Sequence, residues 1–447
     1  MSVELPNGTV LVAGGTRSGP SSLHGELLAA DGSAFTPAGT MTQARLYGAA
    51  TLLSKSRVLV AGGDTSLSQS TPVPTTAEVW SPAGGGTFTA TGAMHVSRQA
   101  FALTTLPTGL ALAAGGSPEL PAHTETATAE LYNPATNKWT LTGSMPAGRQ
   151  GDSATLLPSC KVLIVGDNPS ATTYNYATGT FSPGPSEGAF QRSYQTATLL
   201  ASGKVLIAGG ETVTGVGLAT ASVYNPATGT FTPTANNMSS ARVQGFAARL
   251  PDGRVVVGGG FTSGGLNPPD TPTVDIYNPA TNKFSPATSL PGTPFAAGVP
   301  AQALHNGKVA VMSVDNTATD TDIYTPDAGG SPASPPPLNC TGLFSIMSTT
   351  AGSRGAIKLK LGVPSGGSVK ATATAPVQKG VPHPLAYGHA SASVAHYRVL
   401  TMTISPNSTA RGVLQSRGTL RVRVTATFTP LRGSSVHRVS SVRAHWP

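Results

Sequence analysis

The chain has 447 residues, of which 39% are hydrophobic and 11% are charged, so it can bury a core under a surface rich in hydroxyl groups rather than ion pairs. All 19 acidic residues lie before residue 331, whereas residues 331–447 carry lysine and arginine without any acidic partner. Two cysteines, Cys160 and Cys340, exclude a disulfide-rich scaffold and a multi-cysteine zinc site, and no apolar run is long enough to span a membrane.

The N-terminal residues MSVELPNGTV have neither the basic nor the apolar region of a secretion signal, and they begin in the middle of a repeat. This pattern predicts either a truncated N-terminus or a misplaced start, so the lack of a signal peptide leaves the compartment open. Whether Cys160 and Cys340 pair is left open by the sequence. A bond between them would join the fourth repeat to the start of the C-terminal segment.

A unit of roughly 50 residues recurs through residues 5–327. Its first part is an apolar strand, a turn, a second apolar strand and a double glycine, as in LLASGKVLIAGG at 199–210. The other clear copies lie at 5–15, 52–63, 106–116 and 250–260, with weaker ones at 157–167 and 304–313. The continuous apolar runs predict strands buried on both faces, and the glycine pair predicts a close approach of two backbones.

The second part of the unit is a strand that ends in an aromatic turn, as in AELYNPATNKW at 129–139 and SVYNPATGTF at 222–231. Its Asn-Pro and Thr-Gly pairs are typical of a turn between two strands. The third part is Met-x-x-x-Arg, just ahead of the innermost strand. Its arginines are Arg45, Arg98, Arg149 and Arg242, and Arg192 falls near this position in a divergent unit.

Four short strands per unit predict radial sheets around an axis. The pattern resembles the kelch family, and more narrowly the galactose-oxidase-like propellers of secreted bacterial proteins. We therefore expect an all-β fold: a kelch-type β-propeller over residues 1–327, with seven blades favoured and six as the alternative. The first unit lacks the strand that should precede its hairpin.

A Pro/Gly/Ser-rich linker is predicted at 328–337, followed by a basic domain at 338–447. Its strands are expected at 356–363, 368–375, 397–404, 419–428 and 436–446, where basic and apolar residues alternate. This pattern predicts a small Ig- or fibronectin-like β-sandwich with one basic, solvent-exposed face. The residues expected to bind a polyanion there are Lys358, Lys360, Arg421 and Arg423.

The family resemblance implies a copper ion held by tyrosine and histidine, beside a tyrosine crosslinked to cysteine. This sequence has no Tyr-His pair, and Cys160 falls in a hairpin turn. The histidines of the propeller segment are widely separated: His24, His95, His123 and His305. We therefore expect no copper-radical chemistry, no metal site and no cofactor.

The repeated arginines are the best candidates for a ligand site, because equivalent positions in a radial repeat meet near the channel mouth. Arg45, Arg98, Arg149, Arg192 and Arg242 are expected either to bind an anionic group there or to bond backbone carbonyls and neighbouring carboxylates. Longer loops at 64–77, 117–129, 211–221 and 261–274 carry a few charged residues. These are Asp64, Glu119, Glu125, Glu211 and Asp270.

The sequence therefore favours an extracellular, monomeric, non-enzymatic binding protein. Its expected partners are a carbohydrate or protein ligand at the propeller and an anionic cell-wall polymer at the basic domain, without specific nucleic-acid binding. The alternatives are a galactose-oxidase-like or carbohydrate-active propeller enzyme and an intracellular kelch scaffold.

Overall fold

A computed structural model of the chain describes residues 1–15, 23–65, 73–118, 124–188, 191–264, 269–288, 301–304, 306–314, 319–326, 344–363, 367–378, 381–394, 398–430 and 435–446. The chain divides into two compact units, with the main division between Pro336 and Pro337. The predicted linker at 328–337 lies outside the described residues. The unit boundaries expected at 327 and 338 stay a prediction.

The larger unit is built from consecutive antiparallel sheets, in each of which sequence neighbours pair. The first sheet contains β1 (Ser2–Glu4), β2 (Val10–Ala13), β3 (His24–Leu28) and β4 (Phe35–Thr40). The second contains β5 (Ala49–Leu52), β6 (Val58–Ala61), β7 (Ala77–Ser81) and β8 (Thr87–Ala90). The third contains β9 (Ala102–Thr105), β10 (Ala111–Ala114), β11 (Ala129–Asn133) and β12 (Lys138–Leu141).

The fourth sheet contains β13 (Ser153–Leu156), β14 (Val162–Val165), β15 (Ser170–Asn175) and β16 (Thr180–Ser186). The fifth contains β17 (Thr196–Leu199), β18 (Val205–Ala208), β19 (Ala221–Asn225) and β20 (Thr230–Pro233). The sixth contains β21 (Phe246–Arg249), β22 (Val255–Gly258), β23 (Val274–Asn278) and β24 (Lys283–Ala287). Within the described residues a last sheet contains β25 (Ala301–Ala303), β26 (Val309–Val314) and β27 (Thr319–Tyr324).

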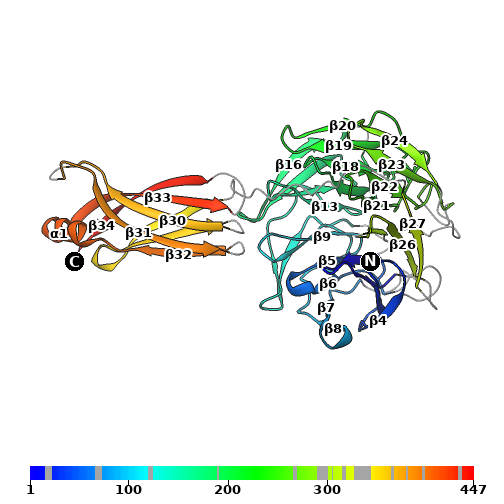
Figure 1. The fold of residues 1–447 in the computed structure, drawn as a ribbon, viewed down its shortest axis with the longest axis horizontal. Helices are drawn as coiled ribbons and strands as arrows, with labels where there is room; N and C mark the ends of the chain where they lie inside the picture. The colour runs from blue at the N-terminus through cyan, green and yellow to red at the C-terminus, as the bar shows by residue number, and fades with distance from the viewer. Residues whose placement is uncertain are drawn as a thin grey trace. The chain divides into compact units, whose positions relative to one another are not determined.

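The first strand of each sheet is innermost, and Figure 1 shows these strands gathered around a common centre. Each innermost strand contacts the innermost strand of the next sheet, and β1 contacts β25, which closes the ring. This arrangement fits a β-propeller. Strand β1 supplies the inner strand that the sequence had left missing from the first unit, where it pairs with β2.

The repeat motifs take the structures that their chemistry predicts. A Cβ added at Gly210 would lie 2.6 Å from the carbonyl oxygen of Ser193, so the glycine pair allows two backbones to pass closely. In the aromatic turns, Asn137, Gly229 and Asn282 occupy the same position with positive φ, which asparagine and glycine tolerate best. The Tyr132 and Trp139 rings that flank one such turn pack 5.2 Å apart within a core shared with the preceding sheet.

The smaller unit consists of two sheets whose buried faces share one hydrophobic core. One sheet has the order β28 (Ser345–Ala351), β29 (Ile357–Val363), β32 (Arg398–Ile404). The other has the order β31 (Leu385–Val394), β30 (Gly367–Ala375), β33 (Thr419–Pro430), β34 (Val436–His445). The sequence did not predict β28, β31 or the helix α1 (Ser408–Arg417), which buries Ala410 and Leu414. Asn407 caps α1 by accepting a hydrogen bond from the Ala410 amide at 2.8 Å.

Short 3-10 turns complete the described elements: η1 (Ser54–Ser56), η2 (Ala83–Gly85) and η5 (Ser353–Gly355). Within the described parts of the chain, no helix is long and apolar enough to cross a membrane. Cys160 is disulfide-bonded. The only other cysteine in the sequence, Cys340, lies outside the described residues.

Candidate active site

All five repeated arginines are buried, each just before the innermost strand of a sheet. Four of them form buried ion pairs with a carboxylate. These pairs are Arg45–Glu78 at 3.1 Å, Arg98–Glu130 at 3.1 Å, Arg192–Glu187 at 3.1 Å and Arg242–Asp275 at 2.6 Å. A guanidinium group held in this way is a structural clamp, because its charge is already paired inside the protein. The Nε atoms of Arg45, Arg98 and Arg242 are nevertheless buried without a hydrogen-bond partner.

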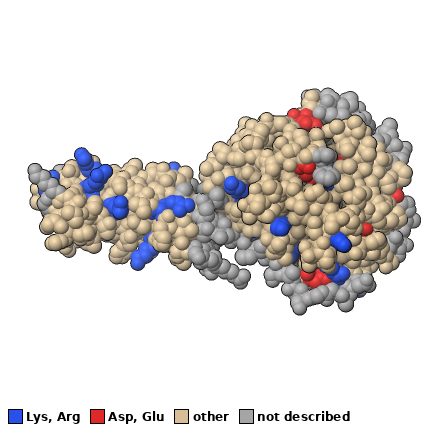
Figure 2. All heavy atoms as spheres, turned by 90° about the horizontal axis from the view of Figure 1, so that it is seen from above, with Lys and Arg blue, Asp and Glu red and all other residues tan. Residues whose placement is uncertain are grey.

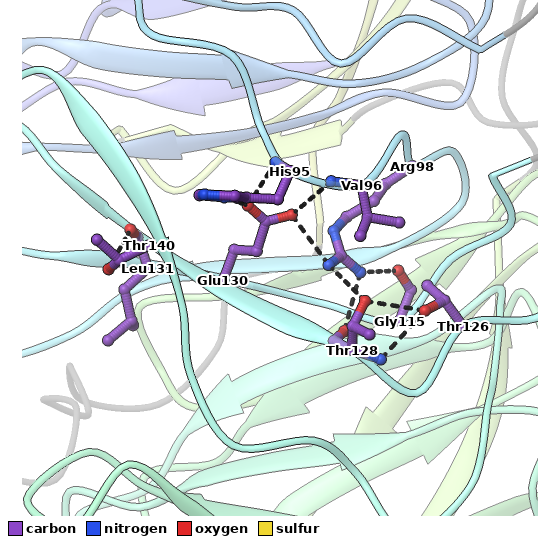
Figure 3. A network of polar contacts seen from close by, with 9 residues as sticks. All are labelled: His95, Val96, Arg98, Gly115, Thr126, Thr128, Glu130, Leu131 and Thr140. Carbon is purple, nitrogen blue, oxygen red and sulfur yellow. Dashed lines mark hydrogen bonds and ion pairs between the residues drawn. The ribbon is translucent and has the colours of Figure 1, made fainter.

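Figure 3 shows one of these clamps in the β9–β12 sheet. Arg98 donates to the carbonyl oxygens of Gly115 and Thr128 at 2.7 and 2.9 Å, and its second nitrogen reaches Glu130. Glu130 also accepts from the backbone amide of His95 at 2.8 Å and contacts the His95 ring at the same distance. The clamp therefore fixes the Met-x-x-x-Arg segment against the third strand of its own sheet.

Arg149 is the exception. In the β13–β16 sheet the clamp position is held by Thr172 instead of an acid, and the Thr172 hydroxyl donates to the Ser182 carbonyl oxygen. One Arg149 nitrogen donates to the Ser170 carbonyl oxygen at 2.9 Å, while Nε and Nη1 are buried without a hydrogen-bond partner. This sheet thus keeps a buried cation whose charge is available to other groups.

Two residues after each arginine, the backbone forms a hydrogen-bonded chain that passes from sheet to sheet. Ala100 donates to Tyr47, Gly151 to Ala100, Tyr194 to Gly151 and Gln244 to Tyr194, at 2.8–3.0 Å. All five residues have positive φ. The chain of amides therefore fixes the backbone at the entry to the innermost strands.

Two carboxyl groups are buried beside this chain, in the sheet that contains Arg149. Asp152 follows Gly151, and neither of its carboxylate oxygens has a hydrogen-bond partner. A Cβ added at Gly166 would overlap Asp152 Oδ1, so the absence of a side chain at Gly166 makes room for this carboxyl. Asp167, which replaces the second glycine of the repeat, accepts from the Gln150 amide at 3.2 Å through Oδ2, and its Oδ1 is unpartnered.

Burial and neighbouring charges shift the protonation of both groups. Burial raises the pKa of Asp152 well above its ordinary value, nearby Asp167 and Glu125 raise it further, and Arg149 acts in the opposite direction. Burial, followed by a side-chain hydrogen bond with Glu125, raises the pKa of Asp167 to about 8. Glu125 itself is exposed. At neutral pH the Asp167 carboxyl therefore retains its proton, beside the exposed Glu125 side chain.

Two tyrosines extend the site. Burial raises the pKa of Tyr194 well above its ordinary range, with further contributions from Tyr47, Glu211, Asp167 and Glu125. The Tyr47 side chain is 49% exposed. A phenol that stays protonated donates a hydrogen bond, so the tyrosines supply donors next to a group of acceptors.

The arrangement of Asp152, Asp167 and Glu125 is suited to acid–base chemistry. A carboxyl that keeps its proton at neutral pH acts as a general acid, and a carboxylate hydrogen-bonded to it acts as a base. The sequence did not identify Asp152, Asp167, Tyr47 or Tyr194, and it treated Glu125 as a loop residue. The signal was present only as the departure of the fourth repeat from the Gly-Gly pattern, VGD at 165–167.

Two described residues of the larger unit are held in other interactions and so are poor candidates for a copper-radical centre. Cys160 is disulfide-bonded and therefore unavailable for a crosslink to tyrosine. His95 is held by Glu130, and no group of three or more histidine, cysteine, aspartate or glutamate side chains suited to a metal occurs in the described parts of the chain. His123 and His305 lie outside them.

The other predicted site residues do not form a single cluster. Glu211 packs against Gly264, which lies in the loop of the next sheet, and Asp64 is buried. Glu119 lies outside the described residues. In the smaller unit, Lys358 and Lys360 are exposed on β29, whereas Arg421 and Arg423 are exposed on β33 of the other sheet. The single basic face expected from sequence is therefore two faces.

Comparison with known proteins shows which solved structures have a similar fold. No family model matched the chain, and no curated protein matched it. Among solved structures, a fungal alcohol oxidase of the AA5 family, determined in complex with copper, is similar with a TM-score of 0.58. The two are 16% identical, and the alignment covers 99% of this chain and 96% of that one. At this identity the likeness establishes the fold.

The comparison corrects the function expected from sequence. A non-enzymatic binding protein was favoured there, but the solved structure that matches almost the whole chain is an enzyme. The binding interpretation is therefore contradicted and is not retained. Four of the five arginines expected at a ligand site are instead paired with carboxylates inside the protein.

Proposed function

We propose that this chain is a carbohydrate-active enzyme that cleaves glycosidic bonds by acid–base catalysis at Asp167 and Glu125. In this proposal the larger unit is a seven-bladed, kelch-type propeller, the smaller unit is an Ig- or fibronectin-like sandwich, and the protein is extracellular. The observation that carries the proposal is the placement of Asp167: its Oδ1 is buried without a hydrogen-bond partner, its pKa is raised to about 8, and the neighbouring Glu125 side chain is exposed.

The roles follow from the environments of the two groups. Asp167 donates its proton to the glycosidic oxygen as the bond from that oxygen to the anomeric carbon breaks. In this proposal the bound substrate separates Glu125 from Asp167, because an acid and a base that act on opposite sides of the anomeric carbon stand about 6.5–9.5 Å apart. Glu125 then accepts a proton from the water that attacks the anomeric carbon, so that the two protons and the two products balance. Arg149 is a positioning residue in this proposal, because its charge lowers the pKa values of both Asp152 and Asp167. Asp152 lies beside it as a second carboxyl whose pKa is raised.

A polyhydroxyl substrate also matches the unpartnered polar atoms of the site. Both oxygens of Asp152, one oxygen of Asp167 and Gln195 Oε1 are buried acceptors without donors. The Gln195 amide nitrogen is bonded to the Val165 carbonyl oxygen at 2.8 Å, which keeps this side chain beside the β13–β16 sheet. Sugar hydroxyls supply the missing donors, whereas an apolar substrate leaves these acceptors unsatisfied.

The test is a screen of the purified full chain for release of reducing ends from neutral polysaccharides and 4-nitrophenyl glycosides, with and without EDTA. We expect hydrolysis that EDTA does not change and that Asp167→Asn reduces about 10²–10⁴-fold, the range for loss of a general acid. In parallel, copper-loaded protein is assayed for peroxide release from primary alcohols. Copper-dependent oxidation without hydrolysis would overturn the proposal, as would full hydrolytic activity in Asp167→Asn.

A further inference from the structure

The outer face of the β31–β30–β33–β34 sheet carries a concentration of cations that sequence spacing did not assemble. Strand alternation directs the exposed residues of β33 and β34 outward, away from the shared core. We call this surface the arginine face and define it by four exposed residues: Lys370, Arg421, Arg423 and Arg443. Figure 2 shows lysine and arginine but no acidic residue over the described part of this unit.

Strand register brings the arginines together. Arg421 on β33 lies directly opposite Arg443 on β34, and Arg423 lies two residues farther along β33. Side chains two residues apart on a strand are about 7 Å apart and share one face. Lys370 lies on the neighbouring strand β30, opposite Thr427. Like charges at this spacing repel one another, so the cluster gains free energy when an anion lies across it.

Hydroxyl side chains surround Arg423, and the same face also exposes His389, His437, His445 and Val439. Thr374 is opposite Arg423, and Ser441 flanks Arg423 on the other side. Thr372 and Thr425 form the adjacent cross-strand pair. Guanidinium groups bind carboxylate or sulfate groups in a planar, two-point geometry, and the hydroxyls between them donate to or accept from a sugar.

We propose that the arginine face binds an acidic polysaccharide, laid across β30, β33 and β34. This proposal stands apart from the catalytic one, because it uses another unit of the chain and no residue of the candidate active site. The ligand carries repeated carboxylate or sulfate groups that meet Arg421, Arg423 and Arg443, while its hydroxyls meet the threonines. No acidic residue follows residue 327, so no anion from this unit competes for the face.

The composition of the face distinguishes this ligand from a nucleic acid. Proteins that bind single strands stack bases on aromatic rings, and those that read duplexes insert a helix or ribbon into a groove. Among the described outward residues of β30, β33 and β34 there is no phenylalanine, tyrosine or tryptophan. The face is part of a regular sheet, so it offers no element of its own for insertion.

The two exposed lysines of the opposite sheet provide a matched control. Lys358 and Lys360 occupy alternate exposed positions on β29, as Arg421 and Arg423 do on β33. Replacing either pair by serine removes two positive charges from an exposed strand of the same unit. The two variants therefore have the same net charge, and they differ in the face from which the two positive charges are removed.

The experiment measures binding of the full chain to polygalacturonate and to dextran sulfate, with neutral dextran as the blank and duplex DNA as the competing class. We expect binding to both acidic polymers that weakens as salt is added. Arg421→Ser/Arg423→Ser should weaken it about tenfold, equivalent to about 1.4 kcal/mol, whereas Lys358→Ser/Lys360→Ser should stay within about twofold of the unchanged chain. Circular dichroism and thermal melts confirm that both variants are folded.

Three results would overturn the proposal. Equal weakening in both variants would mean that net charge alone is responsible, without a site. No binding to either acidic polymer by the unchanged chain would mean that the face has another role. Tighter binding to duplex DNA than to both polysaccharides, lost in the arginine variant, would identify a nucleic-acid surface instead. A preference for polygalacturonate or for dextran sulfate would identify the carboxylate or the sulfate as the group recognised.

Discussion

The raised pKa of Asp167, which suits it to an acid role, also makes the stability of the folded chain depend on pH. Its pKa is about 8 in the fold and near 3.8 when the chain is unfolded, so the folded state binds more protons between these values. The stability that this group contributes is therefore present below about pH 4 and is lost as the pH rises through about 8. The burial that keeps Asp167 protonated for its acid role therefore destabilises the fold at alkaline pH, where the side chain ionises.

We predict that Asp167→Asn raises the stability of the protein at pH 8, by an amount on the order of 1 kcal/mol, and leaves it unchanged near pH 4. Asparagine keeps an oxygen to accept from the Gln150 amide but has no charge to desolvate. Urea denaturation at several pH values measures the difference. Asp31→Asn is the control, because hydrogen bonds from Ser33 lower the pKa of this exposed carboxyl. A variant less stable than the parent at pH 8 would contradict the assigned protonation.

Arg149 and Arg98 occupy equivalent positions but should respond differently to replacement by methionine. Arg98→Met leaves Glu130 buried without its cation, so we expect a loss of about 3–5 kcal/mol in the free energy of unfolding. Arg149→Met breaks no ion pair of this kind, and its loss in stability should be clearly smaller. It also removes the cation that lowers the pKa values of Asp152 and Asp167.

The pH profile of hydrolysis distinguishes a charge effect of Arg149 from a purely structural role, because a structural role would not change that profile in Arg149→Met. With the cation gone, Asp167 should hold its proton to higher pH, so the alkaline limb of hydrolysis and the pH dependence of stability should both shift upward. Denaturation midpoints compare the two arginine variants. Equal destabilisation, or a downward shift of the limb, would argue against a charge effect of Arg149 on the carboxyls.

At the scale of single strands and turns, Gly166 fixes where the Asp152 carboxyl lies. Gly166→Ala places a Cβ on Asp152 Oδ1, so the carboxyl must move while the backbone conformation, which is not a positive-φ one, stays accessible to alanine. We predict at least a tenfold loss of hydrolysis with a folded protein, measured by activity and thermal melting. Gly412→Ala on helix α1 is the control. Gly412 has open space around it, so the alanine should stabilise the helix by up to about 1 kcal/mol and leave activity unchanged.

The repeat elements were predictable because each depends on local chemistry. The apolar run Val205–Ala208 forms β18, fully buried, and the positive φ of Gly229 follows from its turn. The sandwich strand β31 escaped notice because Leu385–Val394 is rich in alanine and serine, which carry little strand signal. Helix α1 escaped because its sequence, STARGVLQSR, is short and weakly amphipathic.

The candidate site was less predictable because it depends on departures from the repeat. The sequence placed Arg149 with the other arginines, and only the structure shows that Thr172 leaves it without an acid at the clamp position. Asp152 and Asp167 come together across two turns of one sheet, beside Glu125 from the previous one. A single sequence does not show such convergence, since the distance between these residues is set by the ring of sheets.

For the whole molecule, ring closure is the feature on which the active-site proposal depends. The contact of β1 with β25 joins the first described sheet to the last, so the ends of the innermost strands are held around one centre. The amide chain from Tyr47 to Gln244 follows this curvature. A buried carboxyl with a raised pKa persists only where its surroundings are rigid enough to exclude water, and the closed ring provides that rigidity.

The disulfide bond of Cys160 adds a covalent constraint to the fold, and its presence can be tested directly. Cys160 is disulfide-bonded at a tight turn where it has positive φ, and the sequence contains one other cysteine. We predict that the denatured, unreduced chain has no free thiol and that Cys160→Ser exposes one. Loss of the bond should lower the free energy of unfolding by about 2–5 kcal/mol. Ellman titration in denaturant measures the free thiols, and urea unfolding measures the free energy of unfolding.

Two reactive thiols in the freshly purified, unreduced chain would contradict the assigned disulfide. An unchanged unfolding midpoint in Cys160→Ser would show that the bond does not constrain the unfolded chain.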